Sequence, residues 1–335
     1  MHLPDIDRLA LASELTFVVQ GAISNMKERD NVNALLESIQ RYFPESTVVL
    51  STWSKALPVY SRIDEIVFSK DPGAQITDDK NQIYHNVNRQ ILSSATGLNL
   101  VKTKYAIKVR NDLIFINDNI MTWLGLIVRA QESGDIPKFG RQRILVTDVT
   151  SVRPDRYLQL PFHPCDWIYM GTTHDLINLF DIPRYPQEWM RYFEKNPFPV
   201  NWPDSNQLSR FPTESYIWSE YIKKYTKINF DHGSDCSQQN LENSRNFFAS
   251  ELVVVPLKNL GIKSLKHNIN WDRYLPMYDY ATWRRISRTG NLFPKFGLLK
   301  NIFVSIIALF WPKGRNLVRF TQHLRFKIMK IWQDL

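Results

Sequence analysis

The chain has 335 residues, of which 44% are hydrophobic and 13% aromatic, and this composition indicates a globular protein rather than a disordered one. A chain of this length forms one large domain or two smaller ones around a sizeable core. Its two cysteines, Cys165 and Cys236, follow no metal-ligand spacing, which argues against a disulfide scaffold or a zinc cluster and favours a reducing compartment. Residues 1–13 lack the basic and apolar regions of a secretory signal, so we expect a cytoplasmic protein.

The formal net charge of +9 is unevenly distributed along the chain. The segment Lys295–Leu335 holds eight Lys or Arg residues against Asp334 alone, and it therefore carries +7 of that charge. Such a basic appendage favours an anionic surface as its target. Nucleic-acid binding fits poorly, because the basic residues are confined to an apolar tail and no DNA- or RNA-binding motif is recognisable.

The first 150 residues alternate between strand and helix patterns, which predicts an α/β fold with a largely parallel sheet covered by helices. The predicted strands are Leu15–Gln20, Ser46–Trp53, Glu65–Phe68 and Arg143–Thr147, and the predicted helices are Asn31–Tyr42, Asn81–Leu98 and Asn119–Gln131. Ligands of such sheets bind beyond the carboxyl ends of the strands. This chain places polar and turn residues there, for example Gln20 and Gly21.

The most informative stretch is Tyr105–Phe115, whose pattern predicts one buried strand with Lys108, Arg110 and Asp112 on a single face. Unpaired buried charge is costly, so such a face suits the end of a strand, over a pocket for an anionic ligand. The alternative is a structural Arg–Asp pair within the sheet.

After residue 150 the pattern becomes irregular and rich in Pro and Trp. The elements predicted here are a strand at Cys165–Gly171, a short helix at Asp175–Phe180, a helix at Thr213–Tyr225 with Thr213 as its N-cap, and a strand at Phe247–Pro256. The segment Pro183–Pro212 contains six prolines and two tryptophans. We expect it to form an ordered loop or lid, because linkers seldom carry so many large aromatic residues.

A series of short motifs between residues 15 and 285 resembles the WavE lipopolysaccharide-synthesis family of Gram-negative bacteria. The motifs are, in order, Val19-Gln-Gly-Ala-Ile23, Leu50-Ser-Thr-Trp53, Asp71-Pro-Gly73, Asn86-Val-Asn-Arg-Gln-Ile91, Gly97-Leu98, Lys108-Val-Arg-Asn-Asp112, Asp166-Trp-Ile-Tyr-Met-Gly171, Thr213-Glu-Ser-Tyr216 and Phe247-Phe-Ala-Ser250. The resemblance implies a glycosyltransferase that builds outer-core or O-antigen saccharides.

The resemblance also implies a GT-A-like, Rossmann-type sheet that binds a nucleotide sugar. In that fold a short acidic motif after the fourth strand holds a divalent metal and the donor diphosphate. The run Lys108-x-Arg110-x-Asp112 falls at this point, although Asn111-Asp112 departs from the usual two aspartates spaced by one. We expect residues 1–150 to bind the nucleotide sugar, 151–290 to bind the acceptor and carry out catalysis, and 291–335 to associate with a membrane.

Transfer of a sugar from a nucleotide places negative charge on the leaving phosphate, which cations or a metal ion stabilise. Lys108, Arg110 and Asp112 are the candidates for this role, with Asp112 binding Mg²⁺ or Mn²⁺ and His267 as a second metal ligand. Other donor-binding candidates lie near strand ends or early in the next helix; they are Gln20, Gly21, Thr52, Asn88 and Arg89. The simpler alternatives are a solvated Arg89 and a structural His267.

The acceptor hydroxyl must lose a proton, and inverting transfer calls for a carboxylate within hydrogen-bond reach of it. Glu214 and Asp166 are the candidates. Glu214 ranks first, because the resemblance implies a base at the start of such a helix, where the helix dipole favours an ionised carboxylate. The same placement is also that of an ordinary helix-stabilising residue.

The C-terminal tail has the composition of helices lying in a membrane interface. Its apolar run Gly297–Trp311 is shorter than the roughly 20 residues that a spanning helix needs, and Arg315–Trp332 combines an apolar stripe with basic residues. The predicted membrane contacts are Lys300, Phe303, Phe310, Trp311, Arg315, Arg319, Arg325, Lys327, Lys330 and Trp332. The alternative is a helical pair packed on the protein's own core.

Together these features favour an inverting glycosyltransferase that is peripheral on the inner face of the inner membrane. Its partners would be a nucleotide-sugar donor, a lipopolysaccharide or other lipid-linked saccharide acceptor, and the anionic membrane surface. Two other functions stay open. One is a non-catalytic membrane-bound assembly partner of saccharide biosynthesis. The other is a sugar-phosphate phosphotransferase, which needs the same cation-rich crevice.

Overall fold

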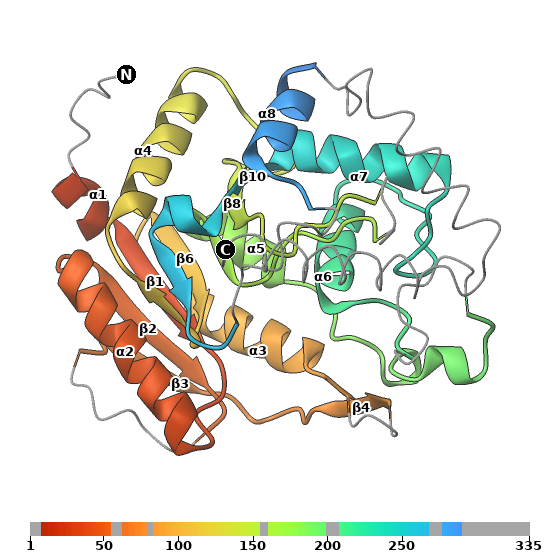
Figure 1. The fold of residues 1–335 in the computed structure, drawn as a ribbon, viewed down its shortest axis with the longest axis horizontal. Helices are drawn as coiled ribbons and strands as arrows, with labels where there is room; N and C mark the ends of the chain where they lie inside the picture. Colours follow the sequence, from red (N-terminus) through yellow and green to blue (C-terminus); the bar gives the residue numbers. More distant parts are fainter. Residues whose placement is uncertain are drawn as a thin grey trace, which may run out of the picture.

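The computed structural model describes residues 8–54, 62–78, 83–154, 160–198, 208–267 and 277–289. A seven-stranded sheet forms its centre and helices flank it (Figure 1). The strands of this sheet are β1 (Leu15–Gln20), β2 (Thr47–Thr52), β3 (Glu65–Phe68), β6 (Tyr105–Arg110), β8 (Ile144–Thr147), β9 (Ile168–Thr172) and β10 (Leu252–Val255). They lie in the order β10-β8-β9-β6-β1-β2-β3, and β9 alone among them runs antiparallel to its neighbours. The predicted α/β class with a largely parallel sheet is confirmed.

Two short antiparallel pairs lie outside this sheet. They are β4 (Gln75–Asp78) with β5 (Ile83–His85), and β7 (Leu113–Phe115) with β11 (Ile262–Ser264). The α-helices are α1 (Arg8–Ser13), α2 (Met26–Tyr42), α3 (Val87–Leu98), α4 (Asn119–Glu132), α5 (Thr173–Phe180), α6 (Thr213–Lys223), α7 (Gln238–Glu251) and α8 (Tyr280–Thr289). Three short 3₁₀ helices are η1 (Gln187–Trp189), η2 (Tyr192–Glu194) and η3 (Leu257–Leu260).

The central strands follow from continuous apolar runs. Every residue of β1 is buried, as expected for a parallel strand that is covered on both faces. Helix α2 begins at Met26, before the predicted start, because Asn25 caps it by accepting a hydrogen bond from the Glu28 amide at 3.0 Å. The Glu28 carboxylate in turn accepts from the Ser24 amide at 2.6 Å, so local side chains satisfy the free donors of this helix end.

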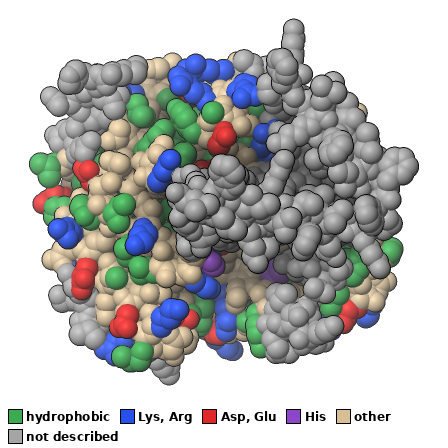
Figure 2. Space-filling view, in the orientation of Figure 1, with side chains coloured by type: hydrophobic (Ala, Val, Ile, Leu, Met, Phe, Trp, Pro, Cys, Tyr) green, Lys and Arg blue, Asp and Glu red, His purple; other side chains and the backbone are tan. Residues whose placement is uncertain are grey.

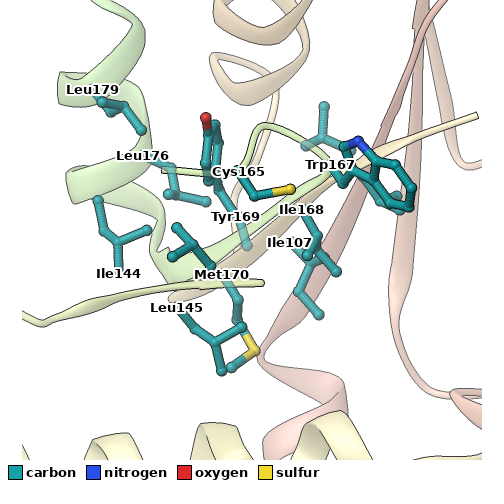
Figure 3. Packing of buried hydrophobic residues seen from close by; sticks show 14 of the residues in the cluster. Ile107, Ile144, Leu145, Cys165, Trp167, Ile168, Tyr169, Met170, Leu176 and Leu179 are labelled. Carbon is teal, nitrogen blue, oxygen red and sulfur yellow. The ribbon is translucent and has the colours of Figure 1, made fainter. Parts of the chain in front are cut away.

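Strand β9 lies among buried hydrophobic side chains of the core (Figure 3). Ile168, Tyr169 and Met170 are fully buried, as are Ile107 of β6 and Leu145 of β8. Each such side chain stabilises the fold by about 1.5–3 kcal/mol relative to an exposed one. Since residues 165–167 lead directly into β9, this packing also fixes the backbone that precedes the strand.

The predicted single strand Tyr105–Phe115 is wrong in one respect, because the chain leaves the main sheet after Arg110. Asn111 and Asp112 form a turn, and β7 then pairs with β11 instead of extending β6. Long-range bonds hold this turn: the Asn111 amide donates to the Gln20 carbonyl at 3.2 Å, and the Leu265 amide donates to the Asp112 carbonyl at 2.9 Å. Both partners are distant in sequence, so strand periodicity alone does not reveal the break.

Three other predicted boundaries are also wrong. Residues 83–85 form β5, and the helix predicted from Asn81 begins at Val87. The predicted strand Phe247–Pro256 is helical up to Glu251, where α7 ends. In this helical conformation the Phe248 ring stacks on Tyr278, with centroids 4.2 Å apart. Thr213 is the first residue of α6, and Pro212 occupies the cap position.

The predicted membrane contacts Lys300 to Trp332 lie outside the described residues. Within the described ranges, every helix is too short or too polar to cross a bilayer. Lys and Arg side chains on the described part of one face are interspersed with acidic and apolar ones (Figure 2). That part of the surface therefore presents a mixed charge pattern rather than a field of one sign.

Candidate active site

The carboxyl ends of β1, β2 and β6 meet at one edge of the main sheet, because the three strands are parallel and in register. Gln20 pairs with Ser51 of β2 on one side and with Arg110 of β6 on the other. Strand β9 runs the opposite way, so its beginning lies at this same edge, where the Arg110 amide donates to the Trp167 carbonyl at 3.2 Å. Side chains from residues 20, 110 and 166 are thereby brought together. We call Lys108, Arg110, Asp112 and Asp166 the charged cluster.

Arg110 is the centre of the charged cluster. Its guanidinium donates to both oxygens of Asp112, from Nε to Oδ1 at 3.0 Å and from Nη2 to Oδ2 at 2.6 Å. Its Nη1 lies 3.7 Å from Asp166 Oδ1, and the group lies 5.4 Å from the Trp167 ring centroid. Burial lowers the pKa of Arg110, but the negative charges of Asp166 and Asp112 raise it by more. The pKa therefore lies above its usual value, and the cation is permanent. The side chain is 22% exposed, so it is not closed off from solvent.

Lys108 has a different position from the one predicted. Its side chain is fully buried, its ammonium donates to the Asp166 backbone carbonyl, and it lies 5.1 Å from the centroid of the Tyr169 ring. Burial lowers the pKa of Lys108 to about 8, and the negative charge of Asp166 opposes this shift. Lys108 therefore fixes the backbone turn that carries Asp166, and its part in donor binding stays a prediction.

The buried Lys108 should make stability depend on pH. Its pKa is about 8 in the folded protein and near 10.4 in an unfolded chain, so between these values the unfolded state holds more protons. The free energy of unfolding of the wild type should therefore rise, relative to Lys108→Met, by about 3 kcal/mol from pH 7.5 to 10.5. Urea denaturation at several pH values measures this difference. Lys102→Met, at an exposed lysine, is the control, and a pH-independent difference for Lys108→Met would contradict the expectation.

Gly21 was expected to let a ligand approach the backbone, and the structure shows that its open side is occupied by Asn111. Gly21 has a φ of +144°, and a Cβ built on it would lie 2.7 Å from Asn111 Cγ. The Asn111 amide group donates to the Ala22 carbonyl from this position. The absence of a side chain at Gly21 therefore lets the turn after β6 close against the end of β1.

Gly21→Ala should lower the free energy of unfolding by about 1–3 kcal/mol, because it combines backbone strain with displacement of Asn111. Gly134→Ala is the matched control: Gly134 has a φ of +90°, and a Cβ added there would meet no other atom within 4 Å. Chemical denaturation of both variants separates the cost of the backbone angle from that of the Asn111 contact. Equal losses in the two variants would show that the contact contributes nothing.

Asn88 and Arg89, two other predicted donor-binding residues, lie in the first turn of α3 and have protein partners. The Asn88 amide group donates to the Tyr185 carbonyl at 3.1 Å and accepts from the Tyr185 amide at 2.8 Å. Arg89 forms a two-point ion pair with Asp71 at 2.7 and 2.6 Å and lies 5.3 Å from the Trp53 ring centroid. Arg89 is therefore not the solvated side chain of the simpler alternative. A role in donor binding stays a prediction for both residues.

Gln20 and Thr52 are also held by neighbours. The Ser93 hydroxyl of α3 donates to the Gln20 side-chain oxygen at 2.7 Å. Thr52 is fully buried, and its hydroxyl accepts from the Ser54 amide at 3.2 Å. These bonds connect the ends of β1 and β2 to their surroundings, so the edge next to the charged cluster is pre-formed.

Glu214 and Asp166, the two predicted bases, lie at the same site although 48 positions separate them. Burial raises the pKa of Glu214, and the negative charge of Asp166 raises it further, whereas the positive charges of His163 and Arg110 oppose the shift. Glu214 stands in the first turn of α6 and its side chain is 18% exposed. A raised pKa at a partly accessible carboxylate is typical of an acid–base group.

His163 is the site residue that the sequence did not reveal. Its Nε2 lies 3.4 Å from Glu214 Oε2, and its Nδ1 lies 3.1 Å from the Thr150 carbonyl oxygen. A carbonyl accepts only, so Nδ1 carries a proton and donates it. Nε2 is therefore the ring nitrogen that faces Glu214, and it places the imidazole beside the carboxylate.

His267 follows β11 and also lies at the site. Its ring stacks on Trp167 with centroids 5.2 Å apart and planes inclined by 30°. Burial and the nearby Arg110 lower the pKa of His267, so the ring is neutral at pH 7. The pairing of β11 with β7 brings it here, and its role as a metal ligand stays a prediction.

A pre-formed divalent metal site does not fit these side chains. Both carboxylate oxygens of Asp112 accept hydrogen bonds from Arg110, so they are not free to bind a cation in this arrangement. Across the described part of the chain, no three His, Cys, Asp or Glu side chains are grouped as metal ligands. We therefore assign the positive charge at this edge to Arg110 and derive no step through a metal ion.

The model of the family described as WavE lipopolysaccharide synthesis matches residues 15–307. That range contains all seven strands of the main sheet, the charged cluster, His163 and Glu214. No curated protein matches the sequence. Because the family match extends over most of the chain, this protein belongs to the WavE lipopolysaccharide synthesis family.

Proposed function

We propose that this protein is an inverting glycosyltransferase that moves a sugar from a nucleotide-sugar donor to a saccharide acceptor of lipopolysaccharide synthesis. One observation carries the proposal: a partly exposed guanidinium, held by two carboxylates, lies at the same sheet edge as a carboxylate–imidazole pair. Sugar transfer needs both functions at one place, a fixed cation for the leaving phosphate and a base for the acceptor hydroxyl.

In this mechanism the acceptor oxygen attacks the anomeric carbon as the bond from that carbon to the phosphate oxygen breaks. The nucleotide leaves with the electron pair, and Arg110 stabilises the negative charge that develops on its phosphate. Glu214 takes the proton of the acceptor hydroxyl, and His163 positions the carboxylate. Asp112 and Asp166 hold Arg110 in place, and Lys108 holds the backbone of Asp166.

The topology supports a GT-A-like fold for this site. Strand β6 is the fourth strand of the main sheet in chain order, and Arg110 is its last residue. The resemblance to that fold puts the donor diphosphate after the fourth strand. The nucleotide would then lie toward the ends of β1 and β2, near Trp53 and Arg89. We also retain a peripheral location on the inner membrane, which follows from the tail at residues 291–335.

The proposal is tested by measuring nucleotide release from a panel of UDP-, dTDP-, GDP-, ADP- and CMP-sugars in the presence of membrane glycolipid extract. We expect the wild type to turn over one donor and Asp112→Ala, which frees Arg110, to lose that activity while staying folded. Assays with and without Mn²⁺ determine whether a metal contributes. No release from any donor by folded wild type would contradict the proposal and favour an assembly partner.

The product also distinguishes the phosphotransferase alternative. Glycosyl transfer from a UDP-sugar releases the nucleoside diphosphate, whereas transfer of sugar phosphate releases the monophosphate. Chromatography of the released nucleotide separates the two. Deleting residues 295–335 should release the protein from membranes, and unchanged sedimentation with membranes would contradict the predicted role of the tail.

A further inference from the structure

A cavity of about 690 Å³ lies between β4 and the segment that contains η1 and η2, and nothing in the proposed mechanism uses it. The side chains that matter for its chemistry are Gln75, Gln187, Glu188, Trp189, Tyr192 and Asn196. Its volume lies within the roughly 300–1,000 Å³ that is typical of ligand sites. We call it the η1 cavity.

The aromatic part of the η1 cavity is held rigidly. The Arg210 guanidinium lies 4.5 Å from the Trp189 ring centroid and 4.8 Å from that of Tyr192. Asp231 fixes Arg210 through an ion pair of 2.5 Å, and the Arg210 amide donates to the Trp189 carbonyl at 2.9 Å. The Gln75 side chain of β4 donates to the side chain of Gln187 in η1. The two rings are thus positioned before a ligand arrives, which limits the entropy lost on binding.

The lining suits an uncharged saccharide. Sugar rings offer apolar C–H faces, which pack on aromatic rings, and many hydroxyls, which bond to amide side chains that both donate and accept. The charged lining residues are Glu188, Arg191, Glu194 and Lys195, two of each sign. Arg191 and Glu194 also pair with each other. The charges of the lining therefore sum to zero, so the cavity has no excess of positive charge for a nucleotide diphosphate or an anionic headgroup.

The η1 cavity lies one helix width away from the proposed base. Trp189 packs edge-on against Tyr216 of α6, with centroids 6.2 Å apart and planes at 82°. Tyr216 follows Glu214 by two positions, and residues so spaced point to different sides of a helix. Trp189 therefore contacts one side of the first turn of α6 and Glu214 projects from another, on a helix about 10–12 Å wide. One sugar cannot fill the cavity and also reach Glu214, but a saccharide chain can.

We propose that the η1 cavity is the acceptor subsite, which holds an inner, uncharged segment of an oligosaccharide whose terminal hydroxyl extends over the start of α6 to Glu214. This inference rests on the proposed function for the identity of the ligand. It specifies that the acceptor is an oligosaccharide rather than a monosaccharide, and that recognition and chemistry occur on opposite sides of α6.

The test uses the full chain and, as probe, the oligosaccharide released from lipopolysaccharide by mild acid. Calorimetry should show that Trp189→Ala raises the Kd for this probe at least tenfold. Trp123→Ala, at a partly buried tryptophan of α4, is the matched control and should leave the Kd unchanged. Gln187→Ala, at an exposed position, should raise the Kd at least threefold. It replaces Trp189→Ala in the test if that variant does not fold.

Kinetics distinguish failure of this inference from failure of the proposed function. In Trp189→Ala the KM for the oligosaccharide should rise at least tenfold, while slow hydrolysis of the donor without acceptor stays at the wild-type rate. Unchanged Kd and KM in both cavity variants, with activity intact, would overturn the subsite and leave the transferase. If no variant hydrolyses any donor, the transferase fails, and the calorimetric comparison alone decides whether the cavity binds saccharide. A wild type that does not bind the probe overturns the inference.

Discussion

Glu214→Gln is expected to lower turnover by about 10²–10⁴-fold with little change in the KM for the donor, because the amide cannot accept the proton of the acceptor hydroxyl. The substitution keeps the shape of the side chain and should leave the fold intact. Steady-state kinetics with the donor found in the panel measure the effect. The control is Glu220→Gln on the same helix. The Glu220 carboxylate is not part of the site and pairs with Lys223 at 2.7 Å. A loss of only a few fold in Glu214→Gln would exclude Glu214 as the base.

The pH profile provides a second test of the Glu214–His163 pair. A base works only when deprotonated, so kcat/KM should fall as the pH drops through the raised pKa of Glu214. A protonated His163 lowers that pKa, so His163→Asn should remove this effect and shift the acid limb to higher pH. An acid limb that stays in place in His163→Asn would contradict the coupling between the two side chains.

Arg110→Lys is expected to lower turnover by about 10²–10³-fold although it preserves the positive charge. A lysine cannot reproduce the two parallel bonds to Asp112, so its charge would move away from the position of the leaving phosphate. The substitution also removes a partner of Asp112 and Asp166, which can lower stability. The thermal midpoint is therefore measured together with the kinetics. Arg143→Lys is the matched control, since Arg143 pairs with Asp135 at 2.7 Å beside α4. Equal losses in both variants would indicate a general effect on folding rather than a role at the site.

A double-mutant cycle isolates the role of the Arg110–Asp112 pair. If Asp112 acts only by orienting Arg110, then Asp112→Asn added to Arg110→Lys should cost little beyond the first substitution. Additive losses in turnover would instead give Asp112 an independent role. That outcome, together with activation by Mn²⁺, would restore Asp112 as a candidate metal ligand.

Local pattern was sufficient for four of the seven strands of the main sheet. The runs at residues 15–20, 47–52, 65–68 and 144–147 were predicted within one or two residues, because a strand covered on both faces must be almost wholly apolar. The parallel arrangement followed from the alternation with helices, and it correctly put polar residues at the carboxyl ends of β1, β2 and β6. The candidates Arg110, Asp112, Asp166 and Glu214 came from the charge pattern, the chemistry of sugar transfer and the family resemblance, and their grouping was not visible in the sequence.

The elements that were mispredicted depend on contacts between distant residues. Strand β6 ends at Arg110 because Asn111 bonds to Gln20 and packs on Gly21, 90 positions earlier. Residues 247–251 are helical because Phe248 packs on Tyr278. In both places the local pattern fits one continuous strand, and contacts with distant residues determine where the strand begins or ends.

What the sequence by itself determined is the class of fold and the kinds of chemical group available: a mostly parallel sheet with cations and carboxylates at its edge. The tertiary structure alone decided which groups meet. The insertion of the antiparallel β9 beside β6 brings Asp166 within 3.7 Å of Arg110, and helix α6 brings Glu214 within 3.4 Å of His163. The physical reason is that these pairings follow from the burial of the apolar residues of β9 and α6. The free energy of that burial depends on contacts with distant residues, which the local sequence pattern does not reveal.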